Sequence, residues 1–218
     1  MRKDEPMTAS SDIAFTPTVK ALQAARGSRS AYARMEEDGG FRTAITRDLA
    51  TFLDGVDTAY LATANAAGQP YAQHRGGPKG FIRVIDGKTL GFADYAGNRQ
   101  YVSTGNLAEN DKAFLFLMDY AHRRRIKLWG RARVVADDPA LIDRLMPEGY
   151  RARPEQAILF EVEAWDVNCP QHIPQKIDAA DVAETVQRLN DRIAALQAEN
   201  ESLKRTLALG PSPEKTRE

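Results

Sequence analysis

The sequence predicts a mainly β fold of the α+β type: an antiparallel barrel of six or seven strands with short flanking helices and a C-terminal coiled-coil helix. Three observations lead to this fold class. Apolar runs between Thr58 and Trp165 are separated by turn residues, including Asp86-Gly87, a dipeptide typical of tight hairpins. Helical patterns do not alternate with every strand, which favours an antiparallel barrel over a parallel sheet. From Val182 onward the apolar residues follow a heptad repeat instead.

Two helices are expected before the first strand, after a disordered N-terminus at residues 1–14. Thr16 offers a capping hydroxyl, Pro17 suits the first helical position, and Gly27 is a typical stop. A second helix is expected at residues 43–53, with one apolar face formed by Ile45, Leu49, Phe52 and Leu53.

The expected strands are residues 58–63, 70–75, 80–86, 88–93, 111–120, 123–136 and 157–165. Short helices are expected at residues 98–107 and 137–146. The run from Ala113 to Met118 is apolar throughout, which predicts a strand buried on both faces. Residues 123–136 alternate instead, so Arg125, Lys127 and Trp129 should face away from Ile126 and its apolar neighbours.

Composition excludes several classes of function. Thirty Lys and Arg balance thirty Asp and Glu, so the chain has no overall attraction to nucleic acid or to an anionic membrane. The basic strand around Trp129 is short and has one aromatic residue, which disfavours single-stranded nucleic acid. His74, His122 and His172 are far apart, and a zinc site needs about four ligands, so no metal is expected. The single cysteine, Cys169, and the lack of a secretory signal favour the cytoplasm.

The tail differs in kind from the rest of the chain. Its apolar seam steps by four and three residues in alternation through Val182, Val186, Leu189, Ile193, Leu196, Asn200, Leu203 and Leu207. Asn200 occupies an a position, which favours a parallel two-stranded coiled coil over residues 176–209. The alternative is one amphipathic helix that lies on the barrel. Residues 210–218 are expected to be a disordered tail.

Two glycine-marked corners hold the candidate site. Arg75 and Lys79 belong to the first corner, and Asn98 and Arg99 belong to the second. These cations, with backbone N–H groups at the start of the following helix, suit a planar ligand that carries a phosphate, such as flavin mononucleotide (FMN). The alternative is that each is a solvated surface residue. The sequence has no P-loop and no Gly-x-Ser-x-Gly motif, so any catalysis would depend on a cofactor.

Several segments together resemble the pyridoxamine 5′-phosphate oxidase-like family, in its predicted flavin-nucleotide-binding branch. They are Gly68-Gln69-Pro70-Tyr71, His74-Arg75-Gly76-Gly77-Pro78, Phe92 to Tyr101, Phe114 to Tyr120, Arg123 to Ala132, and Asn168-Cys169-Pro170-Gln171-His172-Ile173. The resemblance covers about residues 15–175, and the tail lies outside it.

The resemblance implies that residues 15–175 form a split-barrel homodimer with one FMN in each of two clefts at the subunit interface. The cofactor-binding residues that it implies are Gln73, His74, Arg75, Gly76 and Lys79 on one strand and its corner; Asn98, Arg99 and Gln100 at the phosphate; Arg125 near the ring; and Trp165, Asn168, Gln171 and His172 closing the cleft, from either subunit. No catalytic residue is assigned, and Arg125 and His172 are the candidates for stabilising the reduced flavin.

Two departures from the family argue against vitamin B6 oxidation. The oxidase has Ser-Arg-Lys where this chain has Asn98-Arg99-Gln100, and its C-terminal Arg-x-His has no counterpart here. We therefore expect an FMN-dependent oxidoreductase that acts between a small molecule and a reduced nicotinamide nucleotide. The alternatives are a deazaflavin- or haem-binding carrier or stress protein on the same fold, and a dimeric scaffold that recruits a partner through its coiled coil.

Overall fold

The structure, a computed structural model, describes residues 9–167 and 170–208. The chain divides into two compact units, Met1–Pro174 and Gln175–Glu218. The first contains one seven-stranded antiparallel sheet, and the second contains one long helix, α6 (Ala179–Ala208). The expected disordered segments at residues 1–8 and 210–218 lie outside the described residues.

The sheet follows the order β2-β1-β5-β6-β7-β4-β3, and every neighbouring pair is antiparallel. Its strands are β1 (Thr58–Ala64), β2 (Pro70–Gly76), β3 (Arg83–Val84), β4 (Thr89–Tyr95), β5 (Lys112–Asp119), β6 (Arg124–Val135) and β7 (Pro154–Val167). The predicted mainly β fold with six or seven antiparallel strands is confirmed, and the number is seven.

Strand register separates an inner face from an outer face. Leu61 on β1 pairs with Leu115 on β5, and the same row continues through Leu128 to Trp165 on β7. All four side chains are buried in the main core. Because side chains alternate along a strand, the next row points outward.

On the outer face of the sheet, the structure differs from the expectation that the strand from Ala113 to Met118 is buried on both faces. Phe114 and Phe116 on β5 are only half-buried, so this strand is buried on one face and not on both. They lie beside Tyr60 on β1 and Trp129 on β6 in the outward rows. The predicted alternation of β6 is confirmed, since Ile126 and Leu128 are buried while Lys127 and Trp129 are half-buried.

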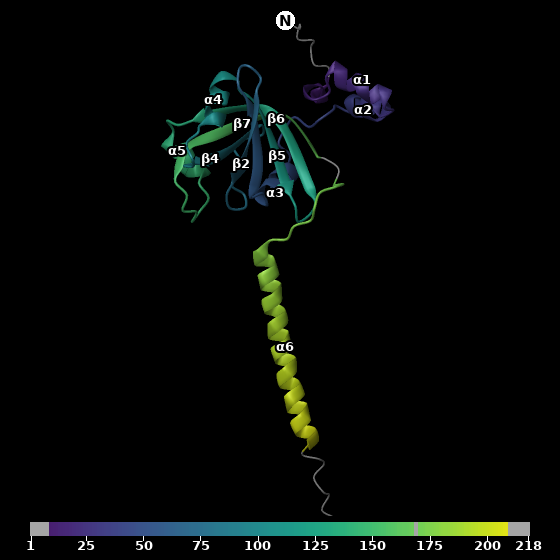
Figure 1. The fold of residues 1–218 in the computed structure, drawn as a ribbon, viewed down its shortest axis with the longest axis vertical. Coiled ribbons are helices and arrows are strands. Elements are labelled where there is room, and N and C mark those ends of the chain that lie inside the picture. Colours follow the sequence, from purple (N-terminus) through teal and green to yellow (C-terminus); the bar gives the residue numbers. More distant parts are fainter. Residues whose placement is uncertain (1–8, 168–169, 209–218) are drawn as a thin grey trace, which may run out of the picture. The chain divides into compact units, whose positions relative to one another are not determined.

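The sheet curls so that its β2 edge approaches β4, although β2 and β4 are not neighbours in the sheet (Figure 1). Arg75 on β2 forms an ion pair with Asp94 on β4. The barrel is therefore closed here by side chains instead of a backbone ladder. The candidate site lies at this side-chain closure between β2 and β4.

In the described part of the chain, five α-helices precede or connect the strands, and three of them begin at a side-chain cap. They are α1 (Pro17–Ala25), α2 (Arg29–Glu37), α3 (Arg47–Asp54), α4 (Val102–Glu109) and α5 (Pro139–Leu145). The Oγ1 atoms of Thr16 and Thr46 accept hydrogen bonds from the N–H of the third residue of α1 and α3, and the Oδ1 of Asp138 does the same for α5. The apolar face of α3 packs Leu49 and Phe52 into the core, as predicted.

Two N-terminal elements were not expected. Residues 9–14, assigned to the disordered N-terminus, contain a 3-10 helix, η1 (Ser10–Ile13), whose Ser10 Oγ donates to the backbone oxygen of Gly39 over 3.0 Å. Helix α2 was not predicted either, and none of its residues is buried. An ion pair between Arg29 and Glu36 spans α2.

Three expected elements are shorter than predicted. The helix expected at residues 43–53 begins only at Arg47, after its cap Thr46. The strand expected at residues 80–86 is reduced to β3, because Gly80 adopts a φ of 78° and Phe81 and Ile82 turn into the core. The helix expected from residue 98 begins only at Val102, after a turn described below. Within residues 9–167 and 170–208, no helix is both long enough and apolar enough to cross a bilayer.

Candidate functional site

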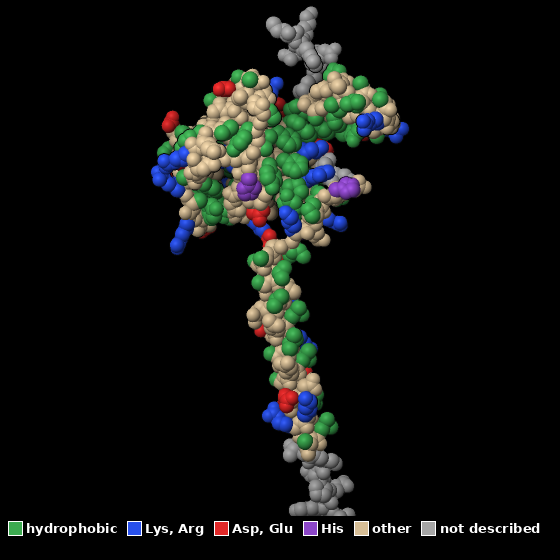
Figure 2. All heavy atoms as spheres, viewed as in Figure 1, with side chains coloured by type: hydrophobic (Ala, Val, Ile, Leu, Met, Phe, Trp, Pro, Cys, Tyr) green, Lys and Arg blue, Asp and Glu red, His purple; other side chains and the backbone are tan. Residues whose placement is uncertain are grey.

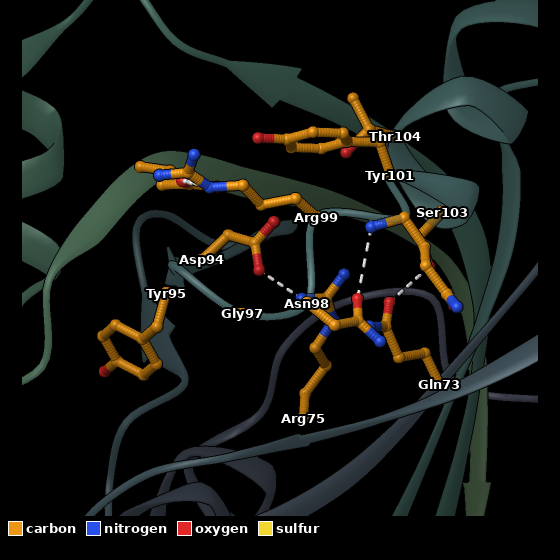
Figure 3. Close-up of a pocket in the computed structure, with 12 residues that line it drawn as sticks. Gln73, Arg75, Asp94, Tyr95, Gly97, Asn98, Arg99, Tyr101, Ser103 and Thr104 are labelled. Carbon is orange, nitrogen blue, oxygen red and sulfur yellow. Dashed lines mark hydrogen bonds and ion pairs between the residues drawn. The ribbon is translucent and has the colours of Figure 1, made fainter.

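A hollow of about 230 Å³ lies where the ends of β2 and β4 meet the start of α4. We call it the Arg75–Arg99 hollow (Figure 3). Its lining is Gln73, Arg75, Asp94, Tyr95, Gly97, Asn98, Arg99, Gln100, Tyr101, Ser103, Thr104 and Glu155. The two predicted cationic corners therefore share one cavity.

Arg75 is held in a fixed orientation by a buried network. Its guanidinium donates through Nη1 to Asp94, which is 8% exposed. The Nε2 of Gln156 donates to the other oxygen of Asp94 over 2.8 Å and to Thr104 Oγ1 over 3.0 Å. The Nε of Arg75 is buried and has no hydrogen-bond partner among the described residues. An unpaired buried guanidinium N–H is costly in free energy, so an acceptor bound beside Arg75 would stabilise this donor.

The turn before α4 presents backbone donors to the same cavity. The Oδ1 of Asn98 accepts from the N–H of Gln100 over 3.2 Å, and Arg99 and Tyr101 have φ values of 58° and 53°. Tyr101 is the N-cap, and no side chain caps this helix end within the described part of the chain. The first N–H groups of α4 thus remain available for an anion, with the favourable end of the helix dipole behind them. Ser103 Oγ donates to Gln73 Oε1 over 2.8 Å, which ties α4 to β2.

Arg99 is more exposed than Arg75. Its side chain is 60% exposed, and its Nε lies 3.5 Å from Glu155 Oε1 on β7. Each arginine in the hollow therefore has one carboxylate partner, Asp94 for Arg75 and Glu155 for Arg99. The exposed pair is weak and can be exchanged for a ligand at little cost, whereas the buried pair is a fixed part of the wall.

A second, smaller hollow of about 190 Å³ adjoins the first and shares Gln73, Arg75, Asp94 and Tyr95 with it. We call it the His74 hollow, and its remaining lining is His74, Gly76, Phe81, Phe92 and Ala93. The hydroxyl of Tyr95 is buried without a hydrogen-bond partner in the described chain. Burial, and next the neighbouring Tyr150, raise the pKa of Tyr95 above 10.0, so this hydroxyl stays protonated at neutral pH.

The structure brings seven of the predicted residues to these two hollows. Gln73, Arg75, Asn98, Arg99 and Gln100 line the first, while His74 and Gly76 line the second. Lys79 is exposed in the loop after β2 and lines neither.

The other predicted residues lie elsewhere in the single chain. Arg125 is half-buried on β6, and Gln171 and His172 are exposed after β7. Trp165 is buried, its Nε1 donates to the backbone oxygen of Ala44 over 2.8 Å, and it lines a separate hollow of about 420 Å³. Asn168 lies outside the described residues.

Sequence reasoning missed several lining residues. Asp94 and Tyr95 stand inside the quoted motif and Ser103 and Thr104 follow it, so proximity to the phosphate corner was an available signal. No signal in the sequence pointed to Glu155, because only the pairing of β7 with β4 brings it to the hollow. Within residues 9–167 and 170–208, no group of three His, Cys, Asp or Glu is placed to hold a metal ion.

Comparisons with known proteins identify a family for this chain. Residues 45–169, more than half of the chain, match the protein family described as pyridoxamine 5′-phosphate oxidase. None of the curated proteins gives a significant match.

Solved structures of low sequence identity are similar in part. HupZ from Group A Streptococcus has 18% identity over 61% of this chain and 99% of its own, with a TM-score of 0.47. A putative pyridoxamine 5′-phosphate oxidase from Lactobacillus delbrueckii has 19% identity over 57% and 95%, with a TM-score of 0.44. An FMN-binding protein from Syntrophomonas wolfei has 11% identity over 68% and 97%, also with a TM-score of 0.44. On the strength of the match over residues 45–169, this chain belongs to the pyridoxamine 5′-phosphate oxidase family.

Proposed function

We propose that the chain binds FMN, with the phosphate of the cofactor in the Arg75–Arg99 hollow. One observation carries the proposal: two guanidinium groups from separate elements line a single cavity at an uncapped helix N-terminus. The phosphate of FMN is a multiply charged acceptor that matches arginine donors and backbone N–H groups.

The donors in the hollow fit this group. Arg75 offers a buried Nε without a partner in the described chain, Arg99 has a weak and exposed partner, and α4 offers its first N–H groups. Together these groups would hold the phosphate and direct the rest of the cofactor along the shared wall toward the His74 hollow.

The size of the hollows supports a homodimer. At about 230 and 190 Å³, each is smaller than the roughly 300–1,000 Å³ of a usual ligand pocket, so a flavin needs a further wall. A second copy is suited to supply it. The His74 ring contacts Tyr60 at a centroid distance of 5.7 Å, and Tyr60 begins the outward row with Phe116 on β5.

The outer aromatic face, defined as Tyr60, Phe114, Phe116 and Trp129, is therefore contiguous with the site. Phe114 contacts Phe116 and Trp129 at centroid distances of 6.3 and 5.2 Å. Half-buried aromatic side chains gathered on one sheet face are typical of interfaces. A copy bound to this face would bury it and bring residues to the cofactor that one chain holds apart, such as Arg125 and His172.

Bound FMN would supply the redox chemistry, accepting and releasing electrons for a small-molecule substrate or a reduced nicotinamide nucleotide. The residues of this chain would bind, orient and exclude water. Arg75 and the α4 N-terminus would fix the phosphate, and the aromatic face would close the site against solvent.

The test is the absorbance spectrum of the purified full-length protein together with its native mass. We expect flavin bands, a mass of two chains plus two FMN, and saturable quenching of FMN fluorescence on titration. Arg75→Met should weaken FMN binding more than riboflavin binding, since riboflavin lacks the phosphate. A colourless protein that does not quench FMN would refute the proposal, and a Soret band or selective binding of a deazaflavin would assign the site to those cofactors instead.

A further inference from the structure

Helix α6 carries an apolar row that no other described residue of its own unit covers. None of its side chains is buried, and the apolar members of the row are 42–81% exposed. Figure 2 shows hydrophobic side chains at intervals along the whole described length of the helix. Its 30 residues correspond to about 45 Å, or roughly four heptads. Such an exposed row over a long helix indicates a missing partner.

The residue types in the row favour two parallel helices. With Asn200 at an a position, the a positions are Val186, Ile193, Asn200 and Leu207, and the d positions are Val182, Leu189, Leu196 and Leu203. β-branched residues at a with leucine at d select a parallel two-stranded coiled coil, because each shape packs best at that position. Three of the four d positions are leucine, and two of the a positions are β-branched.

Asn200 fixes the alignment of the two helices. In a parallel pair in register, each Asn200 amide faces its own copy and can exchange a hydrogen bond with it. In an antiparallel pair, a residues face d residues, so each Asn200 would be buried against a leucine or a valine. An unpaired buried amide is costly, which selects the parallel arrangement.

The flanking charges agree with this register. In a parallel coil each g residue lies beside the e residue five positions later on the partner helix. Glu199 at g would then face Lys204 at e, while Arg192 would face the neutral Gln197. Within one chain, the Nζ of Lys204 lies 3.3 Å from the Oε1 of Glu201, and both side chains are more than 60% exposed. Exchanging this exposed ion pair for one with Glu199 of the second helix therefore costs little free energy. No like charges oppose one another across the seam.

We propose that α6 pairs with α6 of a second copy of this chain as a parallel coiled coil in register, Asn200 against Asn200. In a parallel coiled coil both chains enter from the same end. Pairing therefore raises the local concentration of one Met1–Pro174 unit around the other to about the millimolar range. One consequence rests on the proposed function: α6 would act as a clamp that keeps a two-subunit flavin site intact when the protein is diluted.

Disulfide trapping in the full-length chain tests the pairing. In a Cys169→Ser background, Val186→Cys and Leu203→Cys are oxidised separately at low protein concentration, with Ala198→Cys, on the outward f position, as the matched control. We expect each seam variant to form a covalent dimer with itself and the control to remain mostly uncrosslinked. Crosslinking only in the mixture of Val186→Cys and Leu203→Cys would show an antiparallel pair. A lack of crosslinking both in the separate seam variants and in their mixture, or equal crosslinking of Ala198→Cys, would overturn the pairing.

Flavin content separates this proposal from the proposed function. If the variants crosslink as expected but the protein binds no FMN, the coiled coil stands and the FMN proposal fails. For the clamp, Leu196→Asp in the seam is compared with Ala198→Asp outside it, and flavin retention is followed by fluorescence during dilution. We expect the seam variant alone to release flavin as the protein is diluted. Equal retention in both variants would overturn the clamp.

Discussion

Glu155→Gln should tighten FMN binding, because Glu155 competes with the phosphate for Arg99. The two side chains are 3.5 Å apart, and that of Arg99 is 60% exposed. An exposed ion pair of this kind contributes about 0.2–1 kcal/mol. A ligand that must displace Glu155 loses that amount, so removal of the carboxylate charge should lower the Kd about 1.4- to 5-fold. The buried pair of Arg75 with Asp94 is left intact.

The assay is quenching of FMN fluorescence on titration at fixed ionic strength, repeated with riboflavin. Glu161→Gln is the matched control, because Glu161 is exposed on the same strand but lines a different hollow. We expect Glu155→Gln to tighten FMN and leave riboflavin unchanged, and the gain to shrink at high salt. An unchanged or weaker affinity for FMN, or an equal gain for riboflavin, would refute the assignment of the phosphate to Arg99.

Three further predictions concern stability. Tyr95→Phe removes a buried hydroxyl without a partner in the described chain, so it should stabilise the apo protein by about 1 kcal/mol in denaturant titrations. Because burial raises the pKa of Tyr95 above 10.0, ionisation of its hydroxyl disfavours the folded state as the pH rises above 10, and Tyr95→Phe should lessen the fall in Tm between pH 9 and 11. Gly130→Ala places a Cβ 1.9 Å from the backbone oxygen of Glu161, so we expect a loss of about 3 kcal/mol or more; wild-type stability would contradict the observed register of β6 and β7. The hydrogen bond from Arg29 lowers the pKa of Glu36 below 4.5, so the stability it contributes is present above that pH and lost as the pH falls; Glu36→Gln should flatten this part of the Tm profile between pH 6 and 3.

The amino-acid sequence by itself determined the local elements. The alternation of β6, the capping threonine of α1, and the Asp86-Gly87 turn all depend on neighbours within a few residues. The Oδ1 of Asp86 indeed accepts from the N–H groups of Lys88 and Thr89, each over 2.8 Å. The heptad of α6 is local in the same sense, since its spacing is visible without knowledge of the fold. The two cationic corners were found because glycines and arginines mark them directly.

Tertiary structure decided which of these residues act together. Curling of the sheet brings Arg75 to Asp94, and the pairing of β7 with β4 brings Glu155 to Arg99, neither of which a linear pattern can show. The same long-range pairing left Phe116 half-buried on the outer face, where its apolar character alone predicted a core position. The physical reason is that burial and ion pairing depend on which strands become neighbours. That choice is made by the packing of the whole barrel, and no short stretch of chain carries it.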